Sequence, residues 1–188
     1  LGTGAEQVVR RYFEKVGDLK WEDFQWVDLK VEDMSAALAD GAIVSFTAWE
    51  PTPAIAEATT GAKVMMSYGD IALTPVVIHT TKEYADSHHD ELVAFLRGHL
   101  DKLAMIQNDV DEASQLAAEA ASAQGSEVSA EVFKAIFKRV NFSLDVDDEV
   151  VTALKDTAQF LLEEEVIDII PEFYVDTSFL EEAKKLNQ

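Results

Sequence analysis

Two short segments of the sequence carry residues that could hold a small ligand, and the first is Gly2-Thr3-Gly4. These small residues precede an apolar pattern with the spacing of a helix. Free backbone N–H groups at a helix start, together with the Thr3 hydroxyl, can bind a carboxylate, sulfonate or nitrate oxygen. Thr3 could also serve only as the N-cap of that helix, and the residues alone leave both interpretations open.

The second segment is Ala48-Trp49-Glu50-Pro51, at the end of an apolar, β-rich run. In open α/β sheets, ligands bind at the carboxyl ends of the strands. Trp49 and Glu50 are therefore expected to face a ligand. A Trp at this position is also compatible with packing in the core.

Other candidate groups have simpler structural explanations. His88 and His89 are adjacent, so on a helix their side chains point about 100° apart and do not easily share one ion. The acidic run from Asp145 to Glu149 lacks the glycine at the sixth position of a calcium loop, and it favours a helix start instead. The sequence has no Gly-rich phosphate loop, G-x-S-x-G or H-E-x-x-H motif. We therefore expect no metal, no cofactor and no enzymatic activity.

The composition indicates a folded, strongly acidic protein. The 188 residues are 48% hydrophobic, which is enough for a core and excludes disordered and collagen-like classes. With 15 basic and 36 acidic residues the net charge is −21, so binding to nucleic acid is not expected. No cysteine is present, which excludes disulfides and thiolate chemistry. No apolar run approaches the roughly 20 residues that span a bilayer.

The hydrophobic spacing divides the chain into two parts. Helix and strand patterns alternate through residue 78, and only helical patterns follow. The expected strands are 24–29, 43–49, 63–68 and 74–79, and the expected helices are 3–16, 31–38, 51–59, 90–106, 109–123, 132–140 and 150–162. This order predicts an α/β layer fold over residues 1–78 and a helical part over residues 79–188.

Six segments, taken in their order along the chain, resemble one protein family. They are Gly2-Thr3-Gly4, Met34–Gly41, Ala42–Pro51, Val76–His79, Lys82–Ala85 and Val175–Ala183. In order and spacing these are similar to the second lobe and C-terminal part of periplasmic substrate-binding proteins of the nitrate/sulfonate/taurine ABC-importer type.

The resemblance implies an incomplete periplasmic-binding-protein-like (type II) fold. Residues 1–78 would form the second α/β lobe, and the helices of residues 79–188 would return to a first lobe. Because 188 residues are few for two lobes, either a missing N-terminal half or a homo-oligomer is expected to cover those helices. The implied partners are a small-molecule solute and the membrane subunits of an ABC importer, and the implied location is periplasmic or extracytoplasmic.

The resemblance also assigns roles to individual residues. Gly2, Thr3 and Gly4 would meet an anionic head group, and Trp49 and Glu50 would face the interlobe cleft, which would close around the solute by a hinge motion. An Asp is common in the family where this chain has Glu50. The expected function is thus capture of a small polar or anionic solute.

Two alternatives remain open at this stage. One is an enzyme of the pyrimidine-precursor (thiamine) biosynthesis type on the same fold, with His79 as the candidate reactive group. A His in a strand is more often a structural residue. The other alternative is a helical module in which the last four predicted helices bind a partner protein.

Overall fold

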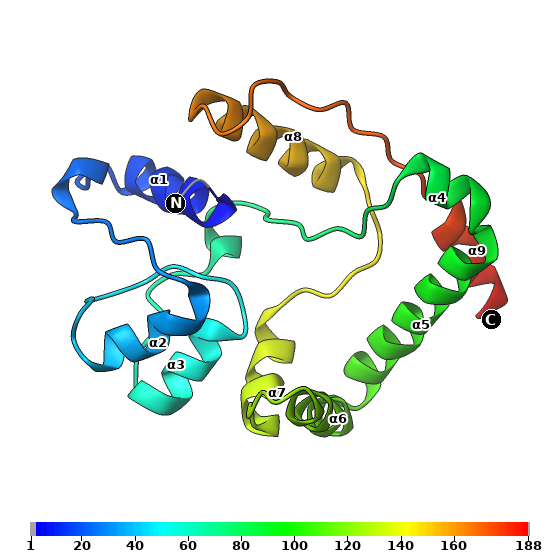
Figure 1. Ribbon diagram of the computed structural model, residues 1–188, viewed down its shortest axis with the longest axis horizontal. Coiled ribbons are helices and arrows are strands. Elements are labelled where there is room, and N and C mark those ends of the chain that lie inside the picture. The colour runs from blue at the N-terminus through cyan, green and yellow to red at the C-terminus, as the bar shows by residue number, and fades with distance from the viewer. Residues whose placement is uncertain (1–2, 188) are drawn as a thin grey trace. The chain divides into compact units, whose positions relative to one another are not determined.

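The computed structural model describes residues 3–187, and within that range the regular structure is entirely helical (Figure 1). The described residues form nine α-helices, two short 3-10 helices and no β-strand. The α-helices are α1 (Gly4–Val16), α2 (Val31–Ala39), α3 (Thr52–Thr60), α4 (Lys82–Ser87), α5 (His89–Asn108), α6 (Val110–Ala123), α7 (Ala130–Arg139), α8 (Asp148–Glu163) and α9 (Ser178–Leu186), and the 3-10 helices are η1 (Trp21–Asp23) and η2 (Tyr68–Asp70).

The predicted α/β, periplasmic-binding-protein-like (type II) fold is therefore wrong for this chain. The four segments expected to be strands lie outside the α-helices, but no strand pairs with them. Within residues 3–187, the backbone groups of 44–48, 63–66 and 73–79 make no hydrogen bond. A β-rich sequence fixes an extended conformation only when a second strand completes the hydrogen-bond ladder.

The chain divides into two compact units. The first comprises the residues up to Pro75 together with Asp148–Phe173, and the second comprises Val76–Asp147 together with the residues from Tyr174 onward. The expected boundary after residue 78 stays a prediction.

In the first unit, α1 packs against α8 through buried polar contacts. Gln7 is 3% exposed. Its Nε2 donates a hydrogen bond to the backbone oxygen of Asp156 at 3.3 Å, and its Oε1 accepts one from the Thr157 hydroxyl at 3.0 Å. Arg10 adds an ion pair of 3.1 Å to Glu164. The fully buried Val8 lies beside Gln7 on α1, so the same helix carries the apolar and polar contacts of this core.

An aromatic cluster joins α1 to the segment that follows it. Trp21 and Trp26 stack with ring centroids 3.8 Å apart, and Phe13 of α1 stacks on Phe24 at 5.0 Å. The Arg10 guanidinium lies 4.1 Å from the centre of the Trp21 ring, a cation–π contact. Contacts among these rings hold the segment that follows α1 against that helix, although the segment forms no strand.

Helices α2 and α3 lie side by side in the first unit (Figure 1). Gly61 ends α3 with φ of 72°, in the left-handed region that favours glycine. Gly17 ends α1 in the same way, with φ of 75° and its N–H donating to the Phe13 oxygen at 2.9 Å. The helix ends predicted from these glycines are confirmed.

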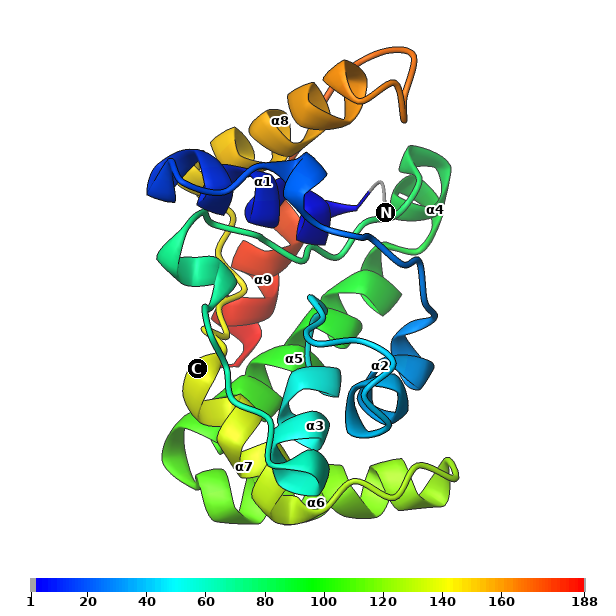
Figure 2. The same cartoon turned by 90° about the vertical axis from the view of Figure 1, so that its left-hand side faces the viewer.

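The second unit pairs α5 with α9 and α6 with α7 (Figure 1 and Figure 2). On the first pair, His89 lies 3.3 Å from a carboxylate oxygen of Glu182, and its ring is 5.1 Å from that of Phe179. On the second pair, Lys134 of α7 forms an ion pair with Asp111 of α6. The four helices predicted from amphipathic patterns after residue 78 are confirmed, as α5, α6, α7 and α8.

None of the helices in the described part of the chain is long and apolar enough to cross a membrane.

The pairing of α1 with α8 predicts a measurable coupling between Gln7 and Thr157. Gln7→Ala should lower the free energy of unfolding by about 1 kcal/mol, because it removes two part-buried hydrogen bonds to α8. A double-mutant cycle with Thr157→Val, measured by urea unfolding, should give a coupling energy of about 1 kcal/mol. Gln25→Ala is the control and should change stability by less than about 0.5 kcal/mol, because Gln25 is exposed. Strictly additive effects of the two substitutions would contradict the pairing.

The start of α9 predicts a pH-dependent contribution from Asp176. The Ser178 hydroxyl and the Ser178 backbone N–H donate to Asp176 Oδ1 at 2.6 and 2.9 Å, and these hydrogen bonds lower the pKa of Asp176 below its ordinary 3.8. Because the pKa is lower in the folded state, the stabilisation is present above pH 3.8 and is lost as the pH falls through the lowered value.

Urea unfolding of the unsubstituted protein and of Asp176→Ala tests this contribution. The difference in midpoint should be largest near neutral pH and should shrink towards pH 3. Ser178→Ala removes the hydroxyl donor and should reproduce part of the loss. A difference that stays constant with pH would show that the hydrogen bonds to Asp176 do not contribute.

Candidate functional site

The start of α1 leaves the Thr3 side chain unused as a cap. Thr3 has the extended backbone of an N-cap residue, but its hydroxyl accepts no hydrogen bond from the first turn of the helix. The Thr3 backbone oxygen accepts from Gln7 N at 3.3 Å, so the helix begins at Gly4 as the sequence predicts. Gly2, the remaining residue of this predicted site, lies outside the described residues.

The space around Gly4 is open. Apart from its chain neighbours and its own helix backbone, a Cβ atom built on Gly4 would meet no heavy atom within 4 Å, and the residue does not have a positive φ. Neither packing nor backbone conformation therefore requires glycine here. An Ala at this position would only narrow the approach to the backbone N–H groups of the first turn.

The second predicted site segment presents an exposed indole before a helix. Trp49 is 55% exposed. A Glu50 carboxylate oxygen accepts a hydrogen bond from Ala54 N at 3.1 Å, inside the first turn of α3, and the Glu50–Pro51 peptide bond is cis. Glu50 thereby caps α3 with its side chain, and Trp49 is left at the surface beside that helix start.

The predicted site residues lie in the same unit but on helices with different packing partners. Thr3 and Gly4 begin α1, which packs on α8, whereas Trp49 and Glu50 precede α3, which packs on α2. The strand ends that were expected to bring these residues to one edge of a sheet do not exist in residues 3–187.

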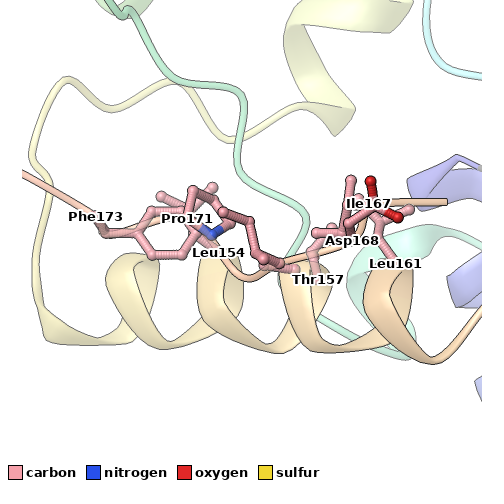
Figure 3. Close-up of a pocket in the computed structure, with 9 residues that line it drawn as sticks. Leu154, Thr157, Leu161, Ile167, Asp168, Pro171 and Phe173 are labelled. Carbon is pink, nitrogen blue, oxygen red and sulfur yellow. The ribbon is translucent and has the colours of Figure 1, made fainter. Parts of the chain in front are cut away.

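A groove runs along α8 in this unit (Figure 3). It has a volume of about 620 Å³ and lies between α8 and the segment 167–173, which folds back along the helix. Its lining residues are mostly apolar, and Asp168 and Thr157 are the polar residues among them. The lining residues are Leu154, Thr157, Ala158, Leu161, Ile167, Asp168, Ile169, Pro171 and Phe173.

The structure gives ordinary structural roles to the histidines and acids considered as metal ligands. His88 stacks on Tyr84 with ring centroids 4.1 Å apart, while His89 contacts Glu182 on α9. Asp145 forms an ion pair of 2.6 Å with Lys184. In the described part of the chain, no group of three or more His, Asp or Glu side chains could hold a metal ion.

His79 is exposed and lies outside the helices, and no strand ends at it. Among the described residues it makes no hydrogen bond or ion pair with another group. The geometry needed by the enzymatic alternative, a His in a strand facing a cleft, is therefore not present around this residue.

Sequence analysis missed the contact between Thr47 and Tyr68. Their hydroxyl oxygens are 2.7 Å apart and share a hydrogen bond. Burial raises the pKa of the Tyr68 phenol, and the hydrogen bond from Thr47 opposes that shift in part. No periodic pattern links positions 21 residues apart, so the sequence offers no signal for this pair.

No family model, curated protein or solved structure matches this sequence. The family resemblance therefore rests on the six segments named above.

Proposed function

We propose that this chain is a solute-binding component of an ABC importer, which captures a small polar or anionic solute of the nitrate, sulfonate or taurine type. The order and spacing of the six family-like segments, from Gly2-Thr3-Gly4 to Val175–Ala183, are the basis of this assignment. The proposal concerns these residues and does not depend on a two-lobe fold.

The exposed indole of Trp49 is the observation that carries the proposal. A tryptophan normally buries most of its ring, and an exposed one beside a helix start is suited to contact a ligand. The bond from Ala54 N to Glu50 holds the adjacent backbone in place, so the indole projects from a fixed support. Glu50 could in addition attract the amine of a zwitterionic solute such as taurine.

The start of α1 offers separate donors for an anion, on a helix with a different packing partner from the helix beside Trp49. Backbone N–H groups of the first helical turn carry partial positive charge, and the Thr3 hydroxyl is available as a further donor. The open space around Gly4 allows an oxygen to approach these groups closely. In this proposal an anionic solute binds by dipoles and hydrogen bonds, because neither site segment contains Lys or Arg.

The proposed activity involves no covalent chemistry. The solute would be bound outside the cytoplasm and released to the membrane subunits of the importer, and a net charge of −21 keeps the carrier from adhering to anionic membrane surfaces.

Isothermal titration calorimetry with nitrate, taurine and an alkanesulfonate tests this function. At least one of these solutes should bind, and Trp49→Ala should weaken its binding by tenfold or more. Tyr174→Ala is the matched control, since Tyr174 is an even more exposed aromatic residue in the other unit and should leave the affinity unchanged. Gly4→Ala should weaken binding without lowering the melting temperature, because a Cβ there meets nothing beyond its own helix and chain neighbours.

Failure of all three solutes to bind the unsubstituted protein would remove the proposal. Equal losses of affinity in Trp49→Ala and Tyr174→Ala would remove the role of Trp49.

A further inference from the structure

The groove along α8 has the size and the lining of a site for a small, mainly apolar molecule. One wall consists of residues that share a single face of the helix, namely Leu154, Thr157, Ala158 and Leu161. The segment 167–173 supplies the other wall. The volume of about 620 Å³ lies within the roughly 300–1,000 Å³ that is typical of small-molecule sites. The size therefore favours a small molecule as the occupant of the groove.

The turn that ends α8 holds the second wall against the helix. Glu165, within this turn, has a φ of 57°, in the left-handed region. Val166 N and Ile167 N donate hydrogen bonds to the Leu161 backbone oxygen at 2.9 and 3.3 Å. This end of the groove is therefore formed before a ligand arrives, so less chain entropy is lost on binding.

Asp168 is the one charged residue among the described residues that line the groove. Within residues 3–187, its carboxylate makes no hydrogen bond or ion pair. The hydroxyl of Thr157, the other polar lining residue, already donates to Gln7 Oε1 at 3.0 Å. The Asp168 carboxylate is thus the polar group that remains available to a ligand, and it favours a cation.

The charged and the aromatic residues of the groove lie at different levels along α8. Figure 3 shows Asp168 beside the C-terminal part of the helix and Phe173 towards its N-terminal part. Between Leu154 and Leu161 the helix rises by about 10 Å, at about 1.5 Å per residue. A ligand with a cationic group at Asp168 could therefore lay a linear apolar chain along α8 towards Phe173.

Exposed apolar surface and net charge both favour such a ligand. Ile169 lines the groove and is 75% exposed, so an apolar chain that covers it removes apolar surface from water. The net charge of −21 attracts cations to the molecule and repels anions. A second copy of the chain would bring the same negative charge, which opposes its entry into the groove.

We propose that the groove along α8 binds a small linear amine in its protonated form. The ammonium group lies at the Asp168 carboxylate, and the alkyl chain lies along α8 towards Phe173 and covers Ile169. This inference is independent of the proposed solute site, which uses Trp49 and the start of α1.

Isothermal titration calorimetry of the full chain with n-octylammonium chloride at pH 7 tests the proposal. The probe should saturate at one molecule per chain and should bind at least tenfold more tightly than octanoate at the same ionic strength. Hexylammonium should bind at least fivefold more weakly than octylammonium, because each buried CH₂ group adds to the affinity. Absence of binding, binding that does not saturate, or equal affinity for octanoate would overturn the proposal.

A charge-specific variant tests the role of Asp168. Asp168→Asn should weaken octylammonium binding about threefold to fivefold and should leave the affinity for uncharged octanol unchanged, because only the charge is removed. Glu172→Gln is the matched control. It removes a negative charge from the same segment at a residue that does not line the groove, so the affinity should change less than twofold. Equal losses in the two variants would show attraction by net charge alone and would overturn the proposal.

An apolar variant tests the position of the alkyl chain. Ile169→Ser should weaken octylammonium and octanol alike by fivefold or more, and circular dichroism should show unchanged helicity because Ile169 is 75% exposed. Val166→Ser is the control, since Val166 is 48% exposed but does not line the groove. An unchanged affinity in Ile169→Ser would place the alkyl chain elsewhere and contradict the proposal.

The oligomeric state provides the remaining outcome. Light scattering of the unsubstituted chain should give a monomer of 20.8 kDa. A stable dimer that Ile169→Ser dissociates would assign the groove to a second copy and overturn the proposal of a small amine.

Discussion

An extended segment leaves its backbone N–H and C=O groups to water unless a second strand lies beside it. This constraint governs the first unit, where the β-rich segments 43–48 and 63–66 have no strand partner within residues 3–187. Regular structure is then left to the helices, whose backbone hydrogen bonds are local and need no distant segment. Without a sheet to cover them, apolar side chains such as Val44 and Met65 are exposed to water. In the described part of the chain, no sheet edge brings the predicted site residues together either.

Helix α1 is the element on which the packing of the first unit depends. Val8 is fully buried, Gln7 is hydrogen-bonded to α8, and Arg10 links the helix both to Glu164 and to the Trp21 ring. The helix start, where we propose that Thr3 and Gly4 meet an anion, therefore belongs to a packed helix rather than to a loop. Trp49 and Glu50 depend on a different support, the first turn of α3.

The sequence predicts the helices well and the strands poorly, for a physical reason. Apolar residues at spacings of three and four predict a helix, and such spacings around Val8 and after Leu92 predict α1 and α5. Helix α3 is predicted by Pro51 at its start and Gly61 after its end. The runs at 24–29 and 43–49 have strand composition, but a ladder depends on a partner that composition does not specify. The same limit applies to the site. The helix start at Gly4 could be predicted from sequence, whereas the exposure of Trp49, the Glu50–Ala54 cap and the Thr47–Tyr68 hydrogen bond could not, because they depend on the backbone path.

Hydrogen exchange measured by mass spectrometry on the unsubstituted chain tests the central claim most directly. The account predicts that amides of 44–48 and 63–66 exchange within about tenfold of the rate of an unstructured peptide, while the middle of α1 around Val8 exchanges at least a hundredfold more slowly. Protection of 44–48 and 63–66 equal to that of α1, in a chain that is monomeric, would mean that these segments pair with strands of their own, and would contradict the account.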